Sequence, residues 1–228
     1  MYIKNRVVSL IFRCVLLIIC GIGLSITTGL YIGRFNINSL VYYTTLSNLL
    51  CFLFYIPLTI RNAINIKNNN ETAIIFFPRL KGAFILMIMI TLIIYHSLLA
   101  NFQFPFFTGD DLSVYLQNLS LHYIVPVMVI FDWILFDPKR TFSVLDPLYW
   151  LSIPLIYAIF ALIRAEVRGI LPGRSTRYPY FFLDIDEIGW SGMIVYVIIF
   201  ALVFALLGYI IWALDRFILG KKCPKILI

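Results

Sequence analysis

The chain has 228 residues, of which 62% are hydrophobic and 13% charged, and its formal net charge is +7. Because a soluble domain carries about 25% charged residues, this composition excludes an ordinary soluble protein and indicates an integral membrane protein. The positive charge flanks long apolar runs, a placement that points to membrane topology and not to nucleic-acid binding.

Six long apolar runs follow one another along the chain, and a helix that spans a bilayer needs about 20 such residues. The expected spans are residues 7–32, 38–60, 82–100, 118–136, 148–164 and 191–212. The first run is too long for a cleavable signal peptide, so we interpret it as the first span. The sequence therefore predicts an all-α polytopic membrane protein, a single domain over residues 1–228 with about six transmembrane helices.

Basic residues at the two ends of the chain predict the orientation. Lys4 and Arg6 precede the first span, and a basic cluster (Arg216, Lys221, Lys222 and Lys225) follows the last, whereas Asp110 lies in a loop with little positive charge. The positive-inside rule then puts both termini in the cytoplasm of a cell-membrane protein. The loop after the fifth span opposes this orientation, since it is expected outside yet contains arginines, including Arg168 and Arg174.

Four polar side chains from four spans fall at a similar depth near the expected outer face. At about 1.5 Å of rise per residue, Thr44 lies about 9 Å from the outer boundary, His96 about 7 Å, and His122 and Arg164 about 6 Å. Polar groups inside a bilayer are costly, face the bundle interior and tend to mark function. This shared depth predicts the candidate site.

The second span carries a polar stripe, because Thr44, Ser47, Asn48 and Cys51 follow the i, i+3, i+4, i+7 spacing of one helix face. Such a stripe either lines a cavity or forms hydrogen bonds that hold helices together. Both interpretations stay open from the sequence. The cysteines, Cys223 included, form no CxxC pair, so no metal site is expected.

A second pair of polar residues lies nearer the expected inner face. Arg13 is about 9 Å from the inner boundary, and Asp132, about 21 Å down its span in a core of ~30 Å, is at a similar level. An unpaired charge there would be expensive, so we predict a structural Arg13–Asp132 ion pair. Asp132 is also about 15 Å of helix away from His122, too far to orient its ring.

The segment RYPYFFLD is rich in aromatic residues and ends at Asp184. Aromatic residues at this position are typical of an interfacial belt. The segment is also long enough to cover the mouth of the bundle, with Asp184 or Glu166 oriented toward a histidine.

A hydroxyl beside an imidazole can act as a nucleophile with its base. In the outer leaflet the accessible carbonyls are those of acyl esters, so Thr44 and His122 predict a lipid esterase without a cofactor. Asn48 or Arg164 are the candidate donors to the oxyanion.

Three blocks, YYTTLSNLL, LHYIVPVMVIFDWILF and YPYFFLD, resemble the conserved blocks of the androgen-induced gene/ADTRP-like membrane family and its bacterial relatives. The resemblance covers most of the chain. It implies a polytopic threonine hydrolase whose substrates are fatty acid esters of hydroxy fatty acids. The family's threonine falls on Thr44 and its histidine on His122, and the adjacent Thr45 leaves a register of one residue open.

Two other functions remain as alternatives. His96 and His122 at matching depth are also typical of a bis-histidine haem protein, and a polar pocket serves a non-catalytic lipid-binding protein equally well. A transporter is disfavoured, because no series of ionisable groups crosses the spans from face to face. In each case the expected partners are lipids and not nucleic acids.

Overall fold

The computed structural model describes residues 3, 5–68, 76–103 and 111–218, and all regular structure within these ranges is helical. Lys4, Asp110, and the basic residues and Cys223 beyond residue 218 lie outside the described residues. Six helical segments are long and apolar enough to cross a membrane, which confirms the expected all-α polytopic fold.

The spans are formed as follows. The first two are α1 (Arg6–Thr28) and α2 (Tyr43–Lys67), and the third is α3 (Pro78–Ile94) continued by the π-helical turn η3 (Tyr95–Leu99). The fourth joins α4 (Leu112–Leu119), the π-helical turn η4 (Ser120–Ile124) and α5 (Val125–Phe136). The fifth comprises α6 (Asp146–Trp150) and α7 (Ser152–Arg168), and the sixth is α8 (Ile185–Ala213) with its π-helical extension η6 (Leu214–Ile218). Short 3₁₀ turns lie between them: η1 (Leu30–Ile32), η2 (Ile37–Val41) and η5 (Phe181–Leu183).

The helix ends differ from the expected spans for local reasons. α1 ends at Thr28 because Gly29 adopts a left-handed conformation with φ of 74°, and its N–H bonds to the Ile26 carbonyl. α2 continues through polar residues to Lys67, beyond the expected end at residue 60. Hydropathy reports only the apolar part of a helix, and backbone hydrogen bonds continue where side chains become polar.

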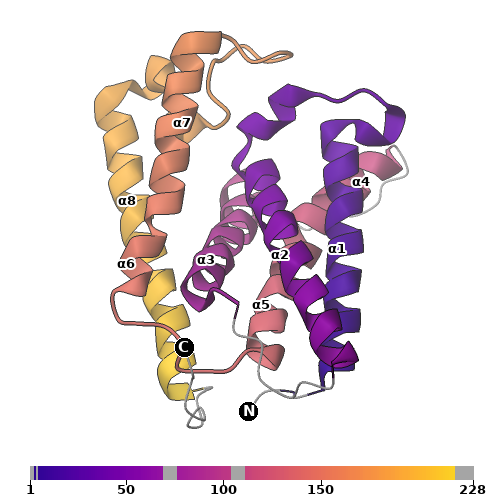
Figure 1. Cartoon of the computed structure of the whole chain (residues 1–228). Helices are drawn as coiled ribbons and strands as arrows, with labels where there is room; N and C mark the ends of the chain where they lie inside the picture. The colour runs from indigo at the N-terminus through magenta and orange to yellow at the C-terminus, as the bar shows by residue number, and fades with distance from the viewer. Residues whose placement is uncertain (1–2, 4, 69–75, 104–110, 219–228) are drawn as a thin grey trace.

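The helices form two layers (Figure 1). α1, α2, α3 and the α4–α5 span pack into one bundle, while α7 and α8 run alongside as a second layer that meets α3 through α6 and α8. α1 begins and α8 ends at the same end of the protein, which we call the terminal end, and the other is the distal end. The structure contains no membrane, so cytoplasmic placement of the terminal end stays a prediction.

The core consists of two apolar clusters. The main cluster fills the first bundle, where Leu16 and Tyr55 are fully buried, and extends to Trp150, Phe204 and Ile211 of the second layer. A smaller cluster joins α7, α8 and the segment between them through residues such as Ala161 and Phe182. The candidate site lies between the layers and is lined by residues of both clusters.

Candidate functional site

An apolar cavity lies between α2 and α3 on one side and α7 and α8 on the other. Its hydroxyl-bearing lining side chains are Tyr43, Thr44, Thr91, Tyr95, Tyr157 and Tyr180. The remaining lining residues are aliphatic, proline or phenylalanine, and no charged side chain is among those the structure describes. Such a lining suits a lipid tail with a few polar groups to orient it.

Thr44 lies in the first turn of α2, where backbone N–H groups lack partners inside the helix. The residue before the helix, Tyr42, provides no side-chain cap. Instead the hydroxyl of Tyr180 accepts a hydrogen bond from the Tyr43 amide at 3.1 Å and also interacts with the hydroxyl and amide of Thr44. Burial raises the pKa of Tyr180 to about 12, so its hydroxyl stays protonated near neutral pH. Tyr180 is therefore a neutral acceptor for polar groups of the first turn of α2.

Ser47 and Asn48 hold helices together. The Ser47 hydroxyl lies 2.8 Å from that of Thr91 on α3. The Asn48 amide nitrogen donates to the carbonyls of Thr44 at 2.8 Å and Leu121 at 3.1 Å, so both of its hydrogens are engaged. Ser47 and Asn48 therefore form hydrogen bonds that hold helices together, one of the two interpretations of the polar stripe. Because both amide hydrogens of Asn48 are engaged, Asn48 is not placed to donate to an oxyanion.

The two threonines at the start of α2 have different surroundings. Thr44 is half-buried and lines the cavity. Thr45 is 1% exposed and is not part of the lining. Of the two threonines that the sequence left as candidates, only Thr44 lines the cavity.

His122 lies next to the cavity but is screened from it by Tyr95. The imidazole stacks on the Tyr95 ring, with centroids 3.5 Å apart and planes 20° apart, and Tyr95 in turn lines the cavity. His122 Nδ1 is 3.2 Å from the Asn118 carbonyl oxygen, and since a carbonyl only accepts, Nδ1 carries the proton and Nε2 is free to act as a base. No hydrogen bond joins Thr44 to His122 in the described structure. The predicted pair is therefore close in the fold without being in contact.

His96 has a separate set of partners. Its Nδ1 is 3.1 Å from the Tyr123 hydroxyl, which also lies 3.4 Å from the Gln103 carbonyl. Both histidines sit in π-helical turns, η3 and η4. Such turns are rare overall but occur often at functional sites. Hydropathy alone did not predict them.

The two histidines do not fit a shared haem. Tyr95 stacks on His122, Tyr123 packs edge-on against Tyr95 with centroids 5.9 Å apart, and His96 packs edge-on against Tyr123 at the same distance. Axial ligation needs both imidazoles to reach one iron, and here tyrosine rings occupy the path between them. The structure gives the haem alternative no support.

Arg164 and Asp184 stabilise the segment between α7 and α8. Arg164 Nη1 donates to the carbonyls of Gly169 at 2.8 Å and Arg177 at 3.0 Å. Asp184 caps α8 by accepting from the amides of Asp186 and Glu187, and it also accepts from the Thr176 hydroxyl. The expectation that Asp184 orients a histidine is wrong, because an acid directly before a helix satisfies the free amides of the first turn.

Glu166 is also engaged elsewhere. Its carboxylate pairs with Arg177 at 3.1 Å and is 62% exposed. Two tyrosines of the same segment pack against the protein, since Tyr178 is 1% exposed and the Tyr180 hydroxyl accepts from the Tyr43 amide. Of these aromatic residues, Tyr180 and Phe182 line the cavity, and neither acid reaches a histidine.

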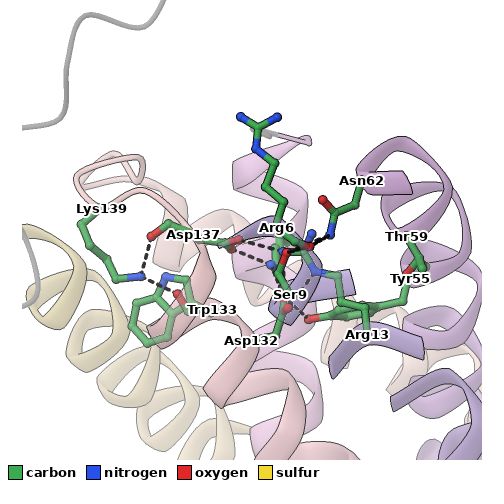
Figure 2. A network of polar contacts seen from close by, with 11 residues as sticks. Arg6, Ser9, Arg13, Tyr55, Thr59, Asn62, Asp132, Trp133, Asp137 and Lys139 are labelled. Atoms are coloured by element: carbon green, nitrogen blue, oxygen red, sulfur yellow. Dashed lines mark hydrogen bonds and ion pairs between the residues drawn. The ribbon is translucent and has the colours of Figure 1, made fainter. Parts of the chain in front are cut away.

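A buried cluster of charges lies toward the terminal end (Figure 2). Arg13 Nε is 2.7 Å from Asp132, the contact expected from their depths. Lys81 Nζ bridges Asp132 at 2.5 Å and Asp137 at 2.6 Å, Arg13 also approaches Asp137 at 3.5 Å, and the Tyr55 hydroxyl donates to Asp132 at 3.1 Å. The two cations and two anions balance, with side-chain exposures of 3%, 5%, 0% and 14% for Arg13, Lys81, Asp132 and Asp137.

Sequence reasoning missed half of this cluster. Lys81 and Asp137 lie at span boundaries and looked like ordinary loop charges. Their positions just inside or after an apolar run were the one available signal. The cluster ties α1, α2, α3 and the end of α5 together, which is a structural function consistent with its burial.

No protein-family model, curated protein or solved structure matches the chain. The resemblance to the androgen-induced gene/ADTRP-like family thus stays a prediction from three sequence blocks, and the site is interpreted from its own geometry.

Proposed function

We propose that the protein hydrolyses a lipid acyl ester of the fatty acid ester of hydroxy fatty acid type, with Thr44 as the nucleophile. The observation that carries this proposal is the placement of Thr44 in the wall of an otherwise apolar cavity. An acyl chain fits the apolar part, and its ester carbonyl then meets the polar groups at the start of α2.

The proposed reaction runs in two halves. Thr44 Oγ1 attacks the ester carbonyl and transfers its proton to His122 Nε2, and the tetrahedral intermediate expels the alcohol, which takes that proton back. Water then attacks the acyl-threonine by the same route and releases the fatty acid. The Tyr180 hydroxyl is the donor proposed for the oxyanion, because both hydrogens of the Asn48 amide are engaged and Arg164 is not part of the cavity lining.

Direct proton transfer requires that Tyr95 moves. Its ring lies between the cavity and His122, stacked on the imidazole. In ligand-free structures catalytic hydrogen bonds are often long and form only with substrate bound. We propose that an entering acyl chain displaces the Tyr95 ring and lets His122 Nε2 reach Thr44.

Non-catalytic lipid binding is the second candidate. It is favoured by the lack of a Thr44–His122 hydrogen bond in the described structure and by the nearly apolar cavity wall. Both candidates predict a bound lipid, and only the hydrolase predicts turnover that depends on Thr44.

The test is fluorophosphonate labelling of detergent-purified protein, together with hydrolysis of a palmitoyl ester of a hydroxystearic acid. Labelling and turnover lost in Thr44→Ala and His122→Ala but kept in Thr45→Ala would support the proposal. Thr45→Ala is a matched control, because it removes the same hydroxyl one residue away from the cavity. Equal labelling of all variants, or none in wild type, contradicts the hydrolase, and co-purified lipid without turnover then favours the binding protein.

A further inference from the structure

A second hollow lies beside the cavity, on the other side of Tyr43 and Tyr157. It is lined by residues of η2, α2, α3 and α7. Tyr43 and Tyr157 border both hollows and pack edge to face with centroids 4.9 Å apart, and the Tyr157 hydroxyl donates to the Val41 carbonyl at 2.9 Å. We call this second hollow the side groove.

The side groove is apolar along most of its length and basic at one end. Leu46 and Leu50 of α2 face Ile156 and Phe160 of α7 across it, and several of these side chains are exposed at the surface of the spans. An exposed apolar groove between membrane helices is in contact with acyl chains, since no other component of the bilayer core is available to fill it.

Arg164 and Arg168 form the basic end. They are four residues apart on α7 and so share one helix face. Both described hydrogen bonds of Arg164 come from Nη1, which leaves Nε and Nη2 to donate. Arg168 is exposed and has no hydrogen bond or ion pair in the described part of the chain. The nearby acid Glu166 is paired with Arg177 and does not neutralise them.

We propose that the side groove binds one anionic glycerophospholipid from the leaflet at the distal end. Its phosphate contacts Arg164 and Arg168, whose planar guanidinium groups match phosphate oxygens in pairs. One acyl chain lies between α2 and α7 along Leu46, Leu50, Ile156 and Phe160. This site is separate from the Thr44 cavity and does not depend on hydrolysis.

Native mass spectrometry of the detergent-purified protein tests the proposal with two defined lipids, palmitoyl-oleoyl phosphatidylglycerol and the matching phosphatidylcholine. We expect phosphatidylglycerol to bind about 10-fold more tightly, and Arg168→Gln to remove most of that preference, a loss typical of one charge-assisted contact. Arg34→Gln is the matched control, because Arg34 is an exposed arginine outside the groove lining. Leu50→Trp should weaken binding of both lipids by filling the groove.

Three results would overturn the proposal. The first is equal affinity for the two phospholipids, and the second is an equal effect of Arg168→Gln and Arg34→Gln. The third is binding of oleate in preference to phosphatidylglycerol, which would assign the site to a free fatty acid. Thr44→Ala should leave phosphatidylglycerol binding unchanged, so a failed hydrolase proposal and a failed lipid site give different outcomes.

Discussion

Replacing Asp132 with asparagine should strongly destabilise the protein. Asp132 is fully buried and accepts from Arg13, Lys81 and Tyr55. The substitution keeps the size of the side chain but leaves two buried cations with Asp137 as their remaining carboxylate partner in the cluster. Removing one partner of a buried ion pair costs about 3–5 kcal/mol. At about 2–4 °C per kcal/mol for a chain of this length, the apparent Tm should fall by about 6–20 °C.

The measurement is size-exclusion chromatography of detergent-purified protein after heating. Asp186→Asn is the control, since Asp186 pairs with Arg177 at 2.6 Å but their side chains are 52% and 28% exposed. Such an exposed pair is worth about 1 kcal/mol or less. The double variant Asp132→Asn/Lys81→Met restores charge balance and should recover part of the loss. Equal Tm values for Asp132→Asn and Asp186→Asn, or no recovery in the double variant, would refute the account of the cluster.

Three further predictions concern packing, titration and capping. Gly23→Ala should cost about 1–3 kcal/mol of stability, because an added Cβ would lie 2.4 Å from the Ser120 hydroxyl. Gly21→Ala on the same helix is the control, since its added Cβ would meet nothing nearer than 3.5 Å. In the same heating assay this control should be close to neutral. Burial lowers the pKa of Lys139 from 10.5 to about 8. Between those pH values the unfolded chain binds more protons than the folded protein, so the stability of wild type relative to Lys139→Met should rise from pH 8 to 10.5. A stability difference that stays flat or falls over this range would show that burial does not penalise the charge of Lys139. Asp184→Ala should cost about 0.5–2 kcal/mol through loss of the α8 cap, measured as a lower Tm, while Asp184→Asn should retain most of it.

The six spans could be predicted from the sequence because the free-energy cost of placing a residue in a bilayer depends on that residue and its neighbours along the chain. Each long apolar run became a span, and the Gly29 turn and the polar end of α2 changed only the boundaries. Depth was equally accessible, because a regular rise per residue converts position into distance from the membrane surface. That is why Arg13 and Asp132 were expected to meet.

Depth, however, gives only the expected position of a residue along the membrane normal. A site also depends on where its residues lie within the plane of the membrane. Thr44 and His122 are expected at one level, yet Tyr95 stacks on His122 and separates it from the cavity that Thr44 lines. The rotation of each helix and the choice of its neighbours depend on how side chains pack. The same packing brings Lys81 and Asp137 into the buried cluster and sends Asp184 to cap α8. The sequence by itself therefore determined the six spans and predicted a depth for each polar group. Only the tertiary structure decided which of these groups touch, because contacts across helices arise from long-range packing that no local pattern encodes.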